Sequence, residues 1–207
     1  MATVSTIDRQ NIDNETRLLA YDYIDYHLRV NGLEWPNRPA ELIPESPATL
    51  VSVMRTLCDR FIDRYVETFG SDNEIASALR VSSSEELSRT FSDVCNMLFQ
   101  PNGDEVAVSW GRIFALFAFG GVLAVKCVHE QLSEHVDRVA DLLVTYVRTN
   151  LSEWIASKGG WDAILHFHDD RQLESPTSLI RRTLGGFGAV CGALGVVALA
   201  AMIVSRH

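Results

Sequence analysis

The chain lacks the features that mark several classes of protein. Its 207 residues include only four cysteines, widely spaced and without a CxxC pair, which argues against a disulfide framework and indicates a reducing, cytosol-facing environment. Acidic residues outnumber basic ones by 27 to 18, and no basic stripe is present that could bind nucleic-acid phosphates. The N-terminal residues MATVSTIDRQ also lack the basic-then-apolar layout of a signal peptide. We therefore expect no nucleic-acid partner and no secretion.

Nothing in the sequence predicts an enzyme. Gly186, Gly188 and Gly192 imitate part of a phosphate-binding fingerprint, but no strand precedes them and no acidic residue follows at the required distance. His166 and His168 are two residues apart, a spacing that splays the imidazoles of a helix, so we predict no metal site. No Ser-His-Asp or Cys-His arrangement can be proposed. We expect no catalytic residues, no cofactor and no small-molecule substrate.

Apolar residues recur at helical spacing, and no segment shows the period-two alternation of a strand. For example, Leu19, Tyr23, Tyr26 and Val30 lie on one face of a first predicted helix that ends near Gly32. The other predicted elements are a second helix from Ser46 to Gly70, a short turn or helix at 73–80, a fourth helix capped by Ser82, Ser83 and Ser84, an apolar helix within 106–128, an amphipathic helix at 131–149, and short helices at 152–157 and 161–167.

Residues 108–124, VSWGRIFALFAFGGVLA, contain a single charge, Arg112. A surface helix has a polar face and this one has almost none, so it is either buried on all sides or placed in a membrane. We expect a soluble bundle in which about six amphipathic helices surround it. The alternative is a membrane span over 106–128, because Arg112 and Lys126 near its ends could snorkel. An arginine in this setting needs a carboxylate, which another molecule could supply.

The C-terminal segment 183–204 is uncharged for about the length of a membrane-spanning helix. Arg181 and Arg182 precede it and Arg206 follows it, so we predict a tail anchor that leaves the bulk of the protein in the cytosol. A buried core helix is the alternative. The expected fold is all-α, a helical bundle with a central apolar helix surrounded by amphipathic helices, plus a C-terminal transmembrane helix. The expected domains are a helical domain at 1–176 and the tail anchor at 183–204.

Four motifs in this chain resemble the homology motifs of the Bcl-2 (B-cell lymphoma 2) family, within residues 15–168. Trp110-Gly111-Arg112 followed by Phe119-Gly120-Gly121 resembles the first motif, and Trp154-Ile155 with Gly159-Gly160-Trp161-Asp162 resembles the second. Residues 50–65 resemble the third motif, the death-agonist helix. Tyr21-Asp22-Tyr23-Ile24 through Gly32 to Trp35 resembles the fourth. The resemblance is to the multi-motif pro-survival members.

The resemblance implies a site for a partner helix. In the family, an amphipathic death-agonist helix lies in a hydrophobic groove and its aspartate pairs with the groove arginine, which by motif position is Arg112 here. The residues implied for the groove are Phe61, Tyr65, Phe69, Val94, Leu98, Ser109, Gly111, Arg112, Ala115 and Phe119. The chain's own death-agonist-like motif consists of Leu50, Met54, Leu57, Cys58, Asp59 and Phe61.

Two positions depart from the family pattern. Ser109, which we predict to be a shorter helix cap, stands where the family usually has asparagine, and Cys58 stands where it usually has glycine or alanine. Cys58 could hinder the close packing of this helix in another groove.

The resemblance implies a pro-survival regulator of apoptosis that binds pro-apoptotic relatives through their death-agonist helices and so prevents permeabilisation of the outer mitochondrial membrane. Phe119-Gly120-Gly121 resembles inhibitors more than effectors. The alternative is a pore-forming effector, in which residues 50–65 turn outward and the apolar helix inserts into the bilayer. A tail-anchored scaffold without groove binding is a third class. The expected location is the outer mitochondrial membrane, with the endoplasmic reticulum as the other candidate.

Overall fold

The computed structural model describes residues 6–39, 49–69, 81–100 and 108–169, and within these ranges the fold is all-helical. The side chains of 6–8, 64–69 and 167–169 lie outside that description. The predicted start of the second helix at Ser46, the element at 73–80 and the anchor at 183–204 also lie outside the described residues. The helices are α1 (Thr6–Val30), α2 (Thr49–Phe69), α4 (Ser84–Phe99), α5 (Trp110–His129), the 3-10 turn η2 (Ser133–His135), α6 (Val136–Tyr146), the π-helical segment η3 (Val147–Leu151), α7 (Ser152–Ser157) and α8 (Ala163–Asp169).

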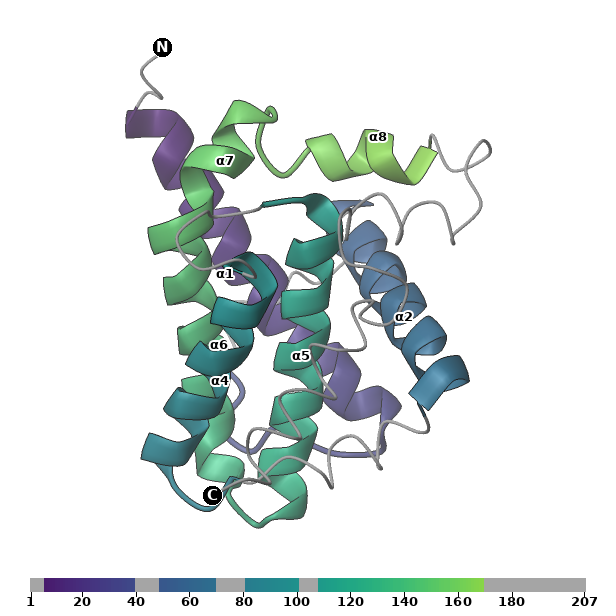
Figure 1. Cartoon of the computed structure of the whole chain (residues 1–207), viewed down its shortest axis with the longest axis vertical. Coiled ribbons are helices and arrows are strands. Elements are labelled where there is room, and N and C mark those ends of the chain that lie inside the picture. The colour runs from purple at the N-terminus through teal and green to yellow at the C-terminus, as the bar shows by residue number, and fades with distance from the viewer. Residues whose placement is uncertain (1–5, 40–48, 70–80, 101–107, 170–207) are drawn as a thin grey trace.

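Helix α5 runs through the middle of the bundle, with α2 on one side of it and α4 and α6 on the other (Figure 1). It packs against α1, α2, α4 and α6, and every residue from Arg112 to Cys127 is buried. Within the part of the chain that the structure describes, α5 is the one helix long and apolar enough to cross a membrane, a test that a buried core helix also passes. The surrounding helices supply the ring of neighbours that the apolar sequence requires. The expectation of a bundle with a central apolar helix is confirmed.

The helix ends follow local signals in the sequence. Ser83 caps α4, because its side-chain oxygen accepts a hydrogen bond from the Glu86 backbone nitrogen at 3.2 Å, and the Glu86 carboxylate in turn accepts from the Ser82 nitrogen at 2.9 Å. Helix α1 ends at Val30 and Gly32 follows with φ of 71°, a left-handed conformation that glycine adopts without strain. The predicted start of α4 and end of α1 are therefore confirmed.

The helix predicted over 131–149 is wrong in its bounds. After η2, the chain runs without a break through α6, η3 and α7, and the conformation at the two junctions stays in the right-handed helical region. Leu143, Val147, Leu151 and Ile155 are all buried although each follows the last by four residues. A four-residue step overshoots an α-helical turn of 3.6 residues, so this face would rotate away from the core. The wider turn of the π-helical segment corrects that drift and keeps all four side chains inside.

The apolar face predicted for α1 is wrong at one position. Leu19 and Tyr23 are buried and Tyr26 is half-buried, as expected, but the Val30 side chain is 65% exposed. Val30 is the last residue of the helix, and the chain turns back after it so that Leu33 packs against the core instead. The middle of α1 packs against α2, α5, α6 and α7, so burial extends well beyond the predicted stripe.

Several polar side chains of α1 are buried, and their partners come from α1 itself and from other segments. Asp25 forms ion pairs with Arg29 at 3.2 Å and with Arg38 at 3.0 Å. Trp35, in the segment after α1, donates its indole N–H to Asp137 of α6 at 2.6 Å and stacks on the Tyr21 ring. These contacts fasten the residues that follow α1 back onto the bundle.

Candidate functional site

The first homology motif forms the start of α5. Ser109 is the N-cap, with φ of −151°, and its side-chain oxygen accepts a hydrogen bond from the Arg112 backbone nitrogen at 3.4 Å. The predicted cap is confirmed. Arg112 itself is only 7% exposed, and burial lowers the pKa of its guanidinium. A cation is therefore held out of water near the N-terminus of the central helix.

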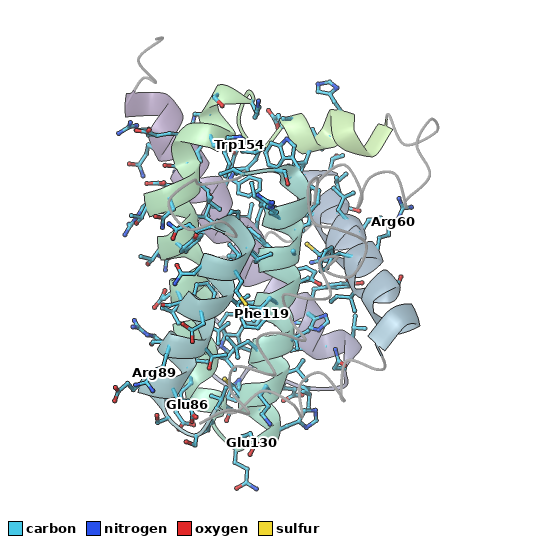
Figure 2. All side chains as sticks on the ribbon, viewed as in Figure 1. Arg60, Glu86, Arg89, Phe119, Glu130 and Trp154 are labelled. Atoms are coloured by element: carbon cyan, nitrogen blue, oxygen red, sulfur yellow. The ribbon has the colours of Figure 1, made fainter. Side chains whose placement is uncertain are left out.

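An aromatic cluster joins the first motif to the second. The Trp110 ring lies edge-on to Trp154 of α7, with the ring centroids 5.1 Å apart, and 5.8 Å from Trp161. Figure 2 shows Trp154 near the end of the bundle where α7 and α8 meet. Trp161 is fully buried and donates its indole N–H to the Thr16 hydroxyl of α1 at 2.9 Å. The cluster thus ties the start of α5, which carries Arg112, to α1 and α7.

The turn between α7 and α8 depends on two glycines. Gly159 and Gly160 have φ of 96° and 79°, which a residue with a side chain rarely adopts. They end α7 and let the chain turn into α8, which packs against α2. The second homology motif therefore brings α8 next to the helix that carries the third.

The predicted groove residues lie on α2, α4 and α5, the two outer helices both packing on α5. Ala115 and Phe119 of α5 and Val94 and Leu98 of α4 are buried, and Phe119 contacts Phe91 with the ring centroids 6.3 Å apart. The partly buried members are Phe61 of α2, the cap Ser109 and Gly111. Tyr65 and Phe69 belong to α2, with side chains outside the described set. The structure thus brings the described members to neighbouring helices, and their contact with a partner stays a prediction.

The chain's own death-agonist-like motif lies on α2 and faces inward. Met54, Leu57 and Cys58 are buried, whereas Leu50 and Phe61 are partly buried. Burial raises the pKa of the Cys58 thiol well above its usual range, so Cys58 is a packing residue and not a nucleophile.

The charged residues of α2 bind to α1. The Asp59 carboxylate accepts a hydrogen bond from the Tyr26 hydroxyl at 2.5 Å. Arg55, one helical turn earlier, donates from Nε and from a terminal nitrogen to the two oxygens of Asp22, at 2.8 and 2.5 Å. Its guanidinium also lies over the Tyr26 ring, 4.8 Å from the centroid.

Burial and these bonds change the acidity of the groups. Burial raises the pKa of Asp59, and the hydrogen bond from Tyr26 counteracts part of that rise. Burial and the bond to Asp59 together raise the pKa of Tyr26 to about 12. The hydrogen bonds to Asp22 raise the pKa of Arg55. At neutral pH the tyrosine is therefore a donor and the arginine a cation, as the observed contacts require.

The sequence interpretation did not include Tyr26, Asp22 or Arg55 among the functional residues. A signal for them exists in the spacing: Asp22 and Tyr26 are four residues apart on α1, and Arg55 and Asp59 are four apart on α2, so each pair shares a helix face. Nothing in the sequence alone says that the two faces meet. Among the described residues no group of three or more His, Cys, Asp or Glu could hold a metal ion.

The fold and motifs define a helical bundle built around one buried apolar helix, with the first homology motif on that helix and the other three on segments around it. The family model "Apoptosis regulator proteins, Bcl-2 family" matches residues 54–161, more than half of the chain. Apoptosis regulator R1 of Xenopus laevis is 34% identical over 196 residues, covering 92% of this chain and 77% of that protein. The chain therefore belongs to the Bcl-2 family of apoptosis regulators, as the motifs indicated.

Two further comparisons delimit the similarity. Human Bcl-2-like protein 1 is 33% identical over 128 residues, which cover 62% of this chain and 50% of that protein, so the match spans half the length of this relative. The crystal structure of chicken BOK superposes with a TM-score of 0.64, covering 77% of this chain and 98% of that one at 24% sequence identity. At that identity the likeness shows the fold alone.

Proposed function

We propose that this Bcl-2 family protein is of the pro-survival type. It binds the death-agonist helices of pro-apoptotic relatives in a hydrophobic groove between α2 and α4, above α5, and so prevents permeabilisation of the outer mitochondrial membrane. Recognition is of the helix-in-groove kind, in which apolar anchors at helical spacing give affinity and one charge pair fixes the register. Segment 183–204 anchors the protein in the outer mitochondrial or endoplasmic-reticulum membrane.

The observation that carries this proposal is the placement of Arg112. Arg112 is a buried residue of the central helix, at the position of the arginine in the first homology motif. Ser109 caps this end of the helix and the tryptophan cluster holds Trp110 in place, so the cation has a defined position. A partly desolvated cation attracts an incoming carboxylate more strongly than an exposed one does.

The composition of α6 favours the pro-survival type over the effector. A pore-forming effector needs α5 and a neighbouring helix in the bilayer. Helix α6 packs against α5, but it carries Asp137, Arg138 and Asp141 within 11 residues. Charged side chains at membrane depth are costly, so this neighbour is a poor partner for insertion.

The groove is tested by Arg112→Ala in the full-length chain, reconstituted in liposomes. Removal of one partner of a desolvated charge pair should weaken binding of a synthetic death-agonist peptide by about 2–4 kcal/mol, roughly thirty- to a thousandfold in Kd. A peptide whose aspartate is replaced by alanine should bind both proteins almost equally. Arg89→Ala on α4 is the matched control, because Arg89 is exposed and pairs only locally with Glu85. Unchanged affinity of Arg112→Ala would contradict the proposed role of the arginine.

The functional type is tested by dye release from liposomes of outer-mitochondrial lipid composition. A pro-survival protein should cause no release alone and should suppress the release caused by a known effector and an activating peptide. Release by this protein alone or with peptide would make it an effector. An absence of any effect would favour the scaffold alternative.

A further inference from the structure

Four side chains form a polar contact between α1 and α2, which we call the α1–α2 clamp: Asp22, Tyr26, Arg55 and Asp59. Asp22 binds Arg55 through two hydrogen bonds, and Tyr26 donates to Asp59 at 2.5 Å. The contacts are interlocked, because the Arg55 guanidinium also lies over the Tyr26 ring. Both bonded pairs join residues 33 positions apart, so one turn of α1, from Asp22 to Tyr26, lies beside one turn of α2, from Arg55 to Asp59.

Separating α2 from α1 at the clamp is energetically unfavourable. The Asp22 side chain is only 4% exposed, whereas that of Arg55 is 29% exposed. If α2 moved away, a buried carboxylate on α1 would lose its counter-charge, and such an uncompensated charge is strongly destabilising. Asp59 is half-buried and would lose its donor as well. The clamp therefore opposes displacement of α2 from α1.

The clamp holds one flank of α2 and leaves the other flank to the proposed groove. At 3.6 residues per turn, the direction of Arg55 and Asp59 is about 160° around the helix from that of Leu57 and Phe61. Phe61 is partly exposed and is the described groove residue on this helix. Between the two flanks, Met54 and Cys58 face the core. Apolar packing alone restricts sliding and rotation of a helix weakly, because it is not directional.

We infer that the α1–α2 clamp is a positioning device that fixes α2 as a wall of the partner-binding groove. Asp22 and Tyr26 are positioning residues: they lie on a helix with no predicted contact to the partner, yet they set the affinity of the site. The apparent Kd of a site rises in proportion as the fraction of molecules in the binding-competent arrangement falls. The same contacts keep Asp59 occupied inside its own chain. This inference rests on the proposed function.

The test compares four variants of the full-length chain in liposomes: Tyr26→Phe, Asp59→Ala, Arg55→Ala and, as a matched control, Arg60→Ala. Arg60 lies on the same helix, is exposed and points away from the bundle (Figure 2). Tyr26→Phe removes the hydroxyl and keeps the ring under Arg55. The double variant Tyr26→Phe with Asp59→Ala completes a cycle that isolates the coupling between the two groups.

Two quantities are measured for each variant: amide hydrogen exchange of α2 relative to α6, and the Kd of the death-agonist peptide that binds the wild type most tightly. We expect Arg55→Ala and Tyr26→Phe to speed exchange of α2 about tenfold, with α6 unchanged, and to raise the Kd by the factor by which they lower the fraction of molecules in the binding-competent arrangement. The double variant should bind the peptide with a Kd no higher than that of its weaker-binding single variant. Arg60→Ala should match the wild type in exchange and in Kd.

Three results would overturn the inference. Exchange that rises equally in α2 and α6 would mean a general loss of stability, and faster exchange of α2 with an unchanged Kd would mean that the clamp does not position the groove. Equal effects of Arg55→Ala and Arg60→Ala would mean that only the charge of the helix matters. If the wild type binds no death-agonist peptide, the proposed function is wrong, whereas the exchange measurement, which needs no peptide, still decides whether the four residues hold α2.

Discussion

Helices α5 and α1 both lie in the core of the bundle, and they are buried in different ways. In α5, every residue from Arg112 to Cys127 is buried, and the only charged ones are near its two ends. In α1, the buried side chains include Thr16, Asp22, Asp25 and His27. Composition alone explains why α5 is inside, whereas in α1 the buried Thr16, Asp22 and Asp25 have polar partners on other segments.

The two helices contribute differently to the stability and to the specificity of the fold. Burial of apolar side chains stabilises α5 strongly. Many combinations of apolar side chains can fill the same core volume, so this burial specifies little about how α5 is oriented. The polar groups of α1 find partners at defined places on α2, on the segment after α1 and on the turn before α8. These directional contacts specify how α1 sits against its neighbours.

Truncation of a buried apolar side chain of α5 should lower the stability of the protein more than the other changes below. Leu116→Ala on α5 should lower the free energy of unfolding by about 2–5 kcal/mol, because Leu116 is fully buried and its truncation leaves a cavity. Urea denaturation of the full-length chain measures the change. Val30→Ala on α1 is the control, since Val30 is exposed and should change stability by less than about 0.5 kcal/mol. Similar losses for the two variants would mean that α5 is not the main source of apolar stabilisation.

The stability of the protein should depend on pH through His27, one of the buried polar residues of α1. Its side chain is 3% exposed, its ring stacks on Tyr23, and its Nε2 atom has no hydrogen-bond partner among the described residues. Burial lowers the pKa of His27 to about 4 from an ordinary 6.5. Because the folded state binds this proton more weakly than the unfolded state, the stability from neutral His27 is complete above about pH 6.5 and is lost as the pH falls toward 4, by about 3 kcal/mol in total.

Urea denaturation at several pH values between about 7 and 4 measures that loss. His27→Gln, which cannot titrate, should lose less stability over the same range than the wild type does. His166→Gln is the control, because His166 is exposed and should leave the pH dependence as it is. An unchanged slope in His27→Gln would show that another group is responsible.

The contact between α1 and α5 should not tolerate a larger residue at Gly121. A Cβ atom there would lie 2.8 Å from Cδ2 of the His27 ring and 3.1 Å from Cε1 of Tyr23, too close for either rigid ring. Gly121→Ala should therefore destabilise by about 1–3 kcal/mol. At the neighbouring Gly120, the added Cβ would meet only the end of the Leu143 side chain at 3.3 Å, so Gly120→Ala should be nearly neutral or gain helix propensity. Thermal unfolding of the two variants separates the cases, and equal shifts would mean that α1 and α5 can move apart freely.

Much of the fold could be predicted because its signals are local. The apolar run predicts a central helix, Ser83 and Ser109 predict helix starts, and Gly32 predicts a helix end. The π-helical segment escaped prediction because its cause is the register of buried residues over several turns, which single helix boundaries do not show. The burial of Asp22 escaped because its partner Arg55 is 33 residues away in the sequence.

In the candidate site, too, some residues could be identified from the sequence and others only from the tertiary structure. Arg112 and the tryptophans of the first two motifs could be singled out from the residues themselves and their resemblance to a family. The structure brings Trp110, Trp154 and Trp161 together at the end of α5 that carries Arg112. Arg55 and Tyr26 could not, because an arginine and a tyrosine on amphipathic helices are ordinary residues until the opposite faces are known. Spacing identifies which residues share a face, whereas tertiary structure decides which faces meet.

We expect the weakest response at the exposed ion pair between Arg9 of α1 and Glu153 of α7. Its N···O distance is 2.8 Å, similar to the distances in the Asp22–Arg55 pair, but the side chains are 56% and 79% exposed. Water and salt screen such a pair, so Arg9→Ala and Glu153→Ala should each cost less than about 0.5–1 kcal/mol, with a coupling that fades at high salt. A double-mutant cycle at low and high salt measures that coupling. A coupling as large as that of Asp22 with Arg55, or one that persists at high salt, would mean that burial does not decide the strength of the polar contacts of α1.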